Sequence, residues 1–287
     1  MALTDSIPAI APAAAPRASV AELRERFRSG KAALLTHFGE SRATAPAASA
    51  LLRALARHVD QMLIDLWAHA GMPASAALLA VGGYGRGELF PYSDVDVLVL
   101  LPNGDSCSSD AMRATIEGFI TACWDVGLEI GSSVRTIDEC LLESRADVTV
   151  QTALLESRLL TGSRRMFNAF RRVNTEAMDA RAFLRAKTFE MRQRQVKYED
   201  SPYSLEPNCK ESPGGLRDLQ VLTWIARAAS LGRTWSEMAS NGLLTPFEVK
   251  QLNRQEGTLK LIRARLHLVA GRREDRLVFD LQTAVAE

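Results

Sequence analysis

Residues 80–100 read AVGGYGRGELFPYSDVDVLVL, in which two glycines are followed by ten residues and then by two aspartates with one residue between them. One short apolar run, 77–81, leads into the glycines, and a second, 95–101, surrounds the second aspartate. Short apolar runs that end at glycines or turn residues are typical of strands in a buried sheet. Side chains alternate along a strand, so we expect Asp94 and Asp96 on one face, about 6.5 Å apart along the strand.

Asp94 and Asp96 are candidate ligands for divalent metal ions. Enzymes that transfer phosphoryl groups often hold two such ions about 3.5–4 Å apart, one at the attacking oxygen and one at the leaving group. Magnesium prefers oxygen ligands of this kind. The apolar neighbours predict that the pair is buried, where two like charges without a cation would be costly. The alternative is a solvated strand edge or a helix cap, since carboxylates are mostly exposed.

The glycines before this strand predict a phosphate-binding loop. Gly82 and Gly83 have no side chain, so backbone N–H groups there can approach triphosphate oxygens closely. Arg86 would add positive charge to the same loop. A glycine-rich loop taken alone is more often an ordinary turn, and the aspartates that follow are what favour phosphate binding.

The rest of the chain predicts a small sheet enclosed by helices. Apolar residues recur at helical spacing before the first strand, and after about residue 137 the strand signals fade into long helical patterns rich in Leu, Ala and Arg. We therefore expect an α+β fold, with a small mixed sheet preceded by helices and followed by a helical domain. The expected helices are 19–45, 47–69 and 110–126, and the expected strands are 77–81, 95–101 and 128–136.

Composition divides the chain into three expected regions. The first is rich in Ala and Pro and offers little surface to bury, so we expect disorder there. The last region stops inside a helical pattern without a capping glycine, from which we expect truncation at the C-terminus. The regions are a disordered tail at 1–18, a nucleotide-handling domain with its N-terminal helices at 19–160, and a helical domain at 161–287.

Charge and cysteine usage exclude several classes of protein. The 35 basic and 34 acidic residues leave a formal charge of +1, which gives no broad positive field for nucleic acid. The four cysteines form no CxxC pair, and the four histidines lack zinc-site spacing. Neither a signal sequence nor a membrane-spanning apolar run is visible. We expect a cytoplasmic protein with no nucleic-acid or membrane partner.

The order of these motifs resembles a known superfamily. A strand ending in Gly-Gly, then ten residues, then Asp-hydrophobic-Asp is similar to the signature of the DNA polymerase beta-like nucleotidyltransferases. The longer string VGGYGRGELFPYSDVDVLVL resembles, more narrowly, the bacterial PII uridylyltransferases. Two further strings support the narrower resemblance, GLEIGSSVRT at 127–136 and NCKESPGGLRDLQ at 208–220. The resemblance runs from about Leu51 to the last residue.

This resemblance implies a specific reaction. Members transfer UMP from UTP to a tyrosine of the PII nitrogen-regulatory protein and release pyrophosphate. By likeness, Asp94 and Asp96 would hold two Mg²⁺ ions, and UTP and the PII protein would be the partners. Members usually continue into further domains, a phosphohydrolase and ACT domains, so the chain is expected to be part of a multifunctional enzyme.

The resemblance also indicates additional site residues. The superfamily normally supplies a third carboxylate from a later strand, and Glu129 is the acidic residue of the third expected strand. It would serve as a metal ligand or a general base, or it is a solvated surface glutamate. Many members have histidine where this chain has Ser132, which puts an imidazole role there in doubt. Lys210 and Arg217 would bind the triphosphate, since a similar loop recurs in glutamine synthetase adenylyltransferases, or they belong to a helix-capping turn.

Two other functions stay open at this point. The chain could transfer a different nucleotide, such as AMP, to a protein or a small molecule, because no residue pattern distinguishes uracil from adenine. It could also be a non-catalytic helical interaction module with a decayed transferase core, although both aspartates are present.

Overall fold

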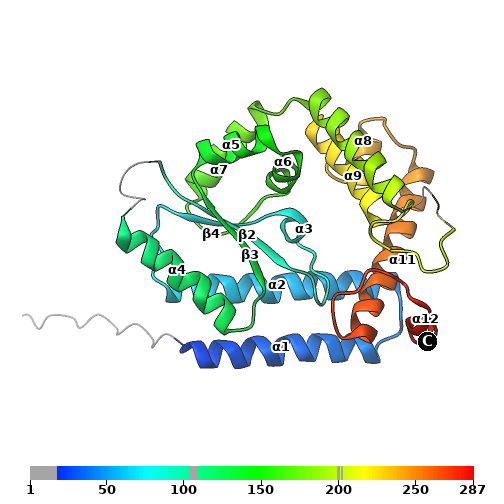
Figure 1. The fold of residues 1–287 in the computed structure, drawn as a ribbon, viewed down its shortest axis with the longest axis horizontal. Helices are drawn as coiled ribbons and strands as arrows, with labels where there is room; N and C mark the ends of the chain where they lie inside the picture. The colour runs from blue at the N-terminus through cyan, green and yellow to red at the C-terminus, as the bar shows by residue number, and fades with distance from the viewer. Residues whose placement is uncertain (1–17, 104–108, 199–200, 202) are drawn as a thin grey trace, which may run out of the picture.

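The computed structural model describes residues 18–103, 109–198, 201 and 203–287, with a small sheet at its centre. Figure 1 shows helices below and above the sheet and a further group of helices beside it, around α8, α9 and α11. The expected disordered tail lies outside the described residues, apart from Ala18.

The sheet has four strands in the order β3-β2-β1-β4. The β2–β3 pair is parallel, whereas β1 pairs with both β2 and β4 in antiparallel fashion. This arrangement confirms the predicted α+β fold with a small mixed sheet. The strands are β1 (Ala77–Ala80), β2 (Val95–Leu100), β3 (Ile130–Arg135) and β4 (Arg158–Gly162).

Strand β4 is absent from the sequence prediction. It lies at the edge of the sheet, its side chains are only partly buried, and its pairing with β1 shifts between Leu78 and Leu79. Its short sequence, RLLTG, lies among Leu-rich helical segments and carries no alternation of its own. The strand crosses the boundary expected between residues 160 and 161, so the sheet extends to Gly162, and the division into domains stays a prediction.

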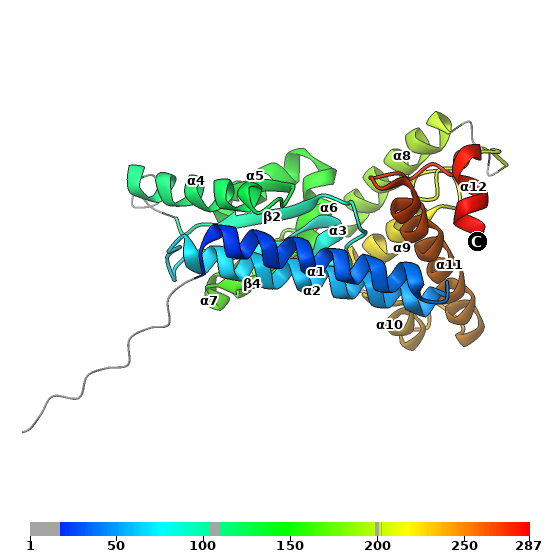
Figure 2. The same cartoon turned by 90° about the horizontal axis from the view of Figure 1, so that it is seen from below.

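Two long antiparallel helices lie under the sheet, as Figure 2 shows. Helix α1 (Val20–Glu40) begins with a capping box between Ser19 and Glu22, and α2 (Ala45–His69) begins at the Thr44 cap. The apolar positions that predicted α2 are buried in the main core. These positions are Leu51, Leu55, Val59, Leu63 and Leu66.

Both faces of the sheet are covered because its central strands are apolar on both sides. Leu78 and Val97 face the core formed with α2 and α4, whereas Leu79 and Leu98 face a second core formed with the helices above. The helix expected at 110–126 is confirmed as α4, and it lies on the same side of the sheet as α2. The helices around the sheet are α4 (Asp110–Asp125), α5 (Ile137–Ala146), α6 (Val148–Leu155) and α7 (Arg164–Glu176).

The described part of the chain after β4 is mostly helical, as expected. Its longest helix, α11, packs against α2 and so joins this half to the part that contains the sheet. Within the part of the chain that the structure describes, no helix is both long and apolar enough to span a membrane. The helices are α8 (Ala180–Lys197), α9 (Leu216–Ala228), α10 (Trp235–Ser240), α11 (Pro246–Ala270) and α12 (Phe279–Ala286).

Candidate active site

A cavity of about 830 Å³ lies between the sheet and the helical half. Cavities of about 300–1,000 Å³ are typical of small-molecule sites. Among the described residues, its walls carry ten Lys or Arg and seven Asp or Glu side chains, so the cavity favours an anionic ligand. All but one of the predicted site residues line it, namely Gly82, Gly83, Arg86, Asp94, Asp96, Lys210 and Arg217.

The glycine loop lies directly beside the second aspartate. It forms the short helix α3 (Gly82–Gly85), and the Val81 N–H donates to the Asp96 carbonyl at 3.0 Å. Gly82 has a φ of +56°, which favours glycine, and a Cβ there would lie 3.4 Å from the Asp96 carboxylate. The loop and the aspartate pair therefore form one continuous wall of the cavity.

Asp94, just before β2, and Asp96, within it, lie on the same face, but the prediction that they are buried is wrong. Val95 and Val97 are buried, whereas both aspartates are exposed toward the cavity. The apolar neighbours pack on the opposite face because side chains alternate along the strand. Loss of water around Asp96 and the charge of Asp94 raise the pKa of Asp96, while Arg273 and Lys210 act in the opposite direction.

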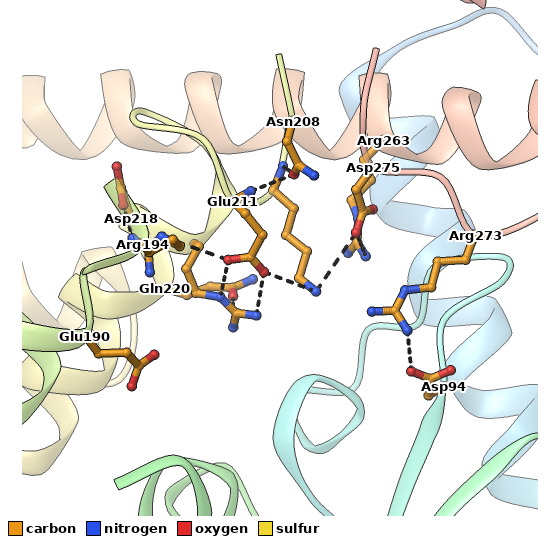
Figure 3. Close-up of polar contacts among 12 residues, drawn as sticks. Asp94, Glu190, Arg194, Asn208, Glu211, Asp218, Gln220, Arg263, Arg273 and Asp275 are labelled. Carbon is orange, nitrogen blue, oxygen red and sulfur yellow. Dashed lines mark hydrogen bonds and ion pairs between the residues drawn. The ribbon is translucent and has the colours of Figure 1, made fainter. Parts of the chain in front are cut away.

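Arg273 was not predicted, yet it contacts the pair. It follows α11, and its Nη1 donates to Asp94 Oδ2 at 2.5 Å (Figure 3). The two residues are 179 positions apart, so no local pattern in the sequence could have linked them. About half of each side chain is exposed. A guanidinium thus lies against the carboxylate that was predicted to bind a metal ion.

Arg86 is paired within the protein. Its guanidinium donates to Glu156 at 2.6 Å, and Glu156 is buried at the end of α6. The loop and α6 are in very close contact, since a Cβ at Gly85 would lie 2.0 Å from the Glu156 carbonyl oxygen. Arg86 therefore anchors the glycine loop, and its role toward phosphate stays a prediction.

The loop 208–218 forms a turn at Asn208 and a charged wall, and the N-cap of α9, Gly215, has no side-chain cap. Asn208 Oδ1 accepts from the N–H groups of Lys210 and Glu211 at 3.0 and 2.8 Å. Arg217 donates to both carboxylate oxygens of Glu211, at 2.9 and 3.2 Å. The Lys210 ammonium lies 3.3 Å from Glu211, and burial lowers its pKa. Arg217 is thus largely satisfied by the protein, whereas Lys210 is more loosely held.

Glu129 is the predicted site residue that does not line the main cavity. It is exposed and borders a smaller cavity of about 80 Å³ together with Lys31. Its backbone lies beside the pair, because the Val95 N–H donates to the Glu129 carbonyl at 3.1 Å. In the described ranges, no three His, Cys, Asp or Glu residues are grouped so as to hold a metal ion. A third carboxylate stays a prediction.

A partly buried polar cluster behind the glycine loop was also missed. The Tyr84 hydroxyl donates to Asp60, and Arg158 donates to the same carboxylate at 2.7 and 3.0 Å. Burial and the neighbouring carboxylate raise the pKa of Tyr84 well above its ordinary value. The cluster ties the loop to α2 and β4, which explains why the loop keeps its place beside Asp96.

Comparisons with known proteins agree with this architecture. Residues 66–150 match the family described as "Nucleotidyltransferase domain", and these residues include both glycines and both aspartates. The fold and this match therefore indicate a nucleotidyltransferase domain in the part of the chain that contains the sheet. Residues 182–287 match the family described as "GlnD PII-uridylyltransferase". Over these residues the chain is similar to the PII-uridylyltransferase family.

Several curated relatives share the sequence over nearly the whole chain. A bifunctional uridylyltransferase/uridylyl-removing enzyme of Cupriavidus pinatubonensis is 56% identical over 270 residues, which are 93% of this chain and 30% of the relative. Those of Burkholderia mallei and Burkholderia thailandensis are each 55% identical, over 92% and 96% of this chain and 30% and 31% of the relative. The chain thus spans about a third of the length of these relatives.

Proposed function

We propose that this chain transfers UMP from UTP to a tyrosine of a PII signalling protein and releases pyrophosphate. The observation that carries the proposal is the placement of Asp94 and Asp96 beside the glycine loop, in a cavity with an excess of positive charge. The names of the relatives support uridylyl transfer as the reaction. The proposal includes a cytoplasmic location and no nucleic-acid or membrane partner.

The donor set at Asp94 and Asp96 fits two Mg²⁺ ions. Both side chains offer carboxylate oxygens toward the cavity, and the guanidinium of Arg273 against Asp94 is consistent with a site that attracts positive charge. When bound, the ions would lower the pKa of the attacking hydroxyl and neutralise charge on the leaving group.

The remaining predicted residues would bind and orient the nucleotide. Gly82 and Gly83 leave space for phosphate oxygens. Lys210 supplies a cation, whose ammonium lies 3.3 Å from Glu211 and 4.0 Å from Asp275. Arg217 and Arg86 would contribute through their fields, since their hydrogen bonds go to protein carboxylates. In the reaction, a tyrosine oxygen bonds to the α-phosphorus, and the bond from that phosphorus to the pyrophosphate oxygen breaks. Glu129 is a candidate general base or third metal ligand.

The proposal is tested by comparing donors and acceptors. UTP and ATP labelled at the α-phosphorus are incubated with the chain, Mg²⁺ and either native PII protein or a PII variant whose acceptor tyrosine is phenylalanine. We expect label from UTP on native PII and none on the variant. Preferential labelling from ATP would instead support an adenylyltransferase, and metal-independent nucleotide binding without transfer would support an interaction module.

A further inference from the structure

His267 makes polar contacts with the segment that precedes Asp94 and with Asp275. Its side chain is fully buried in α11. The backbone N–H of Tyr92 donates to His267 Nδ1 at 3.3 Å, and His267 Nε2 lies 3.2 Å from Asp275 Oδ1. Tyr92 is two residues before Asp94, so the imidazole contacts the backbone of the segment that carries this aspartate.

The partners of the imidazole define its hydrogen bonding. A backbone N–H can only donate, so Nδ1 is the acceptor. In neutral histidine the other nitrogen then carries the proton, and Nε2–H donates to Asp275. Burial lowers the pKa of His267, which favours this neutral form.

The same contacts hold the preceding residues in place. The guanidinium of Arg263 lies over the Phe90 ring at 4.0 Å and donates to Asp275 at 2.6 Å. The His267 ring lies 5.9 Å from the Phe90 ring and 6.3 Å from the Tyr92 ring, between centroids. Segment 90–92 is therefore held by the side chains of α11 through both its rings and its backbone.

Asp275 connects this contact to the other wall of the cavity. Its carboxylate lies 4.0 Å from the Lys210 ammonium, and its carbonyl accepts from the Cys209 N–H at 2.8 Å. Figure 3 shows Asp275 beside Arg263, with Arg273 and Asp94 close by. One carboxylate thus contacts both the imidazole and the cation predicted to bind phosphate.

We propose that His267 is a positioning residue, which fixes the backbone at Tyr92 and thereby the carboxylate of Asp94, while Asp275 links that position to Lys210. The catalytic meaning of this inference rests on the proposed function. The positioning itself does not, because it concerns the backbone of segment 90–94. Groups that orient metal ligands commonly change metal affinity or activity by about 10–100-fold when they are removed.

Two nearly matched variants separate positioning from simple core packing. In His267→Asn the amide oxygen can take the place of Nδ1 and accept from Tyr92, but the donor to Asp275 is lost. In His267→Gln the amide reaches Asp275, but the acceptor for Tyr92 is lost. Both remove an aromatic ring from the same buried place, so a purely structural role predicts similar effects from the two.

Hydrogen–deuterium exchange of the peptide that covers Tyr92 is measured first, in the unmodified chain and in both variants. We expect slow exchange in the unmodified chain and in His267→Asn, and exchange about tenfold faster or more in His267→Gln. Fast exchange of the Tyr92 amide in the unmodified chain would overturn the inference without any variant. Equal exchange in the two variants would overturn it as well.

The Mn²⁺ affinity in the absence of nucleotide is then measured by calorimetry, to test whether the position of Tyr92 affects the metal site at Asp94. His267→Gln should bind Mn²⁺ about tenfold more weakly than His267→Asn, and its kcat should fall more than its KM rises. Equal Mn²⁺ affinity of the two variants would contradict the link from Tyr92 to Asp94. Absence of Mn²⁺ binding in the unmodified chain, with the exchange difference intact, would contradict the proposed metal site and leave the positioning by His267 standing.

Discussion

At the scale of single residues, Asp94 and Asp96 are exposed toward the cavity, while Val95 and Val97 between and beside them pack into the core. The alternation along β2 correctly places Asp94 and Asp96 on one face, but the apolar neighbours led to a wrong expectation of burial. Those neighbours pack on the other face. The contacts of Arg273 and His267 depend on how α11 packs beside the sheet, and local sequence patterns do not predict that packing.

Removing Arg273 should strengthen metal binding in the absence of nucleotide. The guanidinium competes for Asp94, and exposed ion pairs contribute about 0.2–1 kcal/mol, so Arg273→Ala should bind Mn²⁺ about one and a half- to fivefold more tightly. Calorimetry measures the change. Arg272→Ala is the control, because Arg272 pairs with Glu274 instead. Weaker binding in Arg273→Ala alone would indicate that Arg273 supports the site.

The buried imidazole should make the protein less stable in mild acid. Burial holds the pKa of His267 below its ordinary value of about 6.5, so the unfolded chain takes up a proton first as the pH falls. The free energy of unfolding should be unaffected by this group above about pH 6.5 and should decrease below it, by at most about 1.4 kcal/mol per pH unit. Urea unfolding at several pH values should show a shallower decrease for His267→Asn. An identical decrease in both proteins would contradict this prediction.

At the scale of elements, helices and central strands follow from sequence pattern, while edges and close contacts do not. Helix α2 was predicted from its apolar spacing and is buried along that stripe. Strand β4 was missed because an edge strand needs only partial burial, and five residues rich in leucine also fit a helix. In the loop before α9, the turn at Asn208 places Lys210 in the cavity wall, whereas the N-cap of the helix, Gly215, has no side-chain cap.

The contact between α3 and α6 should not tolerate a methyl group. A Cβ at Gly85 would meet the Glu156 carbonyl oxygen at 2.0 Å, so Gly85→Ala must separate the loop from α6. We expect a loss of about 1–3 kcal/mol in the free energy of unfolding, measured with urea. Gly118→Ala, in an exposed and open position of α4, is the control and should stabilise the protein by up to about 1 kcal/mol. Equal stability of the two variants would refute the close contact.

At the scale of the whole molecule, the site is formed by two parts that are distant in the sequence. The aspartates and glycines come from the sheet, whereas Lys210, Arg217 and Arg273 come from the helical half. The sequence motifs predicted residues on both walls, although not Arg273. The closure of the cavity depends on the packing of α11 against α2, which no motif predicts. Glu129 illustrates the limit, because it was predicted within the third strand but lies one residue before β3 and lines a different cavity.

Removal of the Lys210 side chain should weaken nucleotide binding in this cavity. A charged hydrogen bond to phosphate contributes about 1.5–3 kcal/mol, so Lys210→Ala should raise the KM for UTP about tenfold or more. Lys250→Ala, on an exposed position of α11, should leave the KM unchanged. Initial rates of PII labelling at varied UTP concentration measure both. A KM in Lys210→Ala equal to that of the unmodified chain would remove Lys210 from the proposed binding site.

The most direct test is the Mg²⁺-dependent transfer of label from UTP, labelled at the α-phosphorus, to the PII protein by the unmodified chain and by Asp96→Asn. Asp110→Asn, which changes a fully exposed carboxylate at the start of α4, serves as the matched control. We predict that the unmodified chain and Asp110→Asn label PII equally and that Asp96→Asn is slower by about 100-fold or more. Labelling by Asp96→Asn at the rate of the unmodified chain would contradict the assignment of the active site.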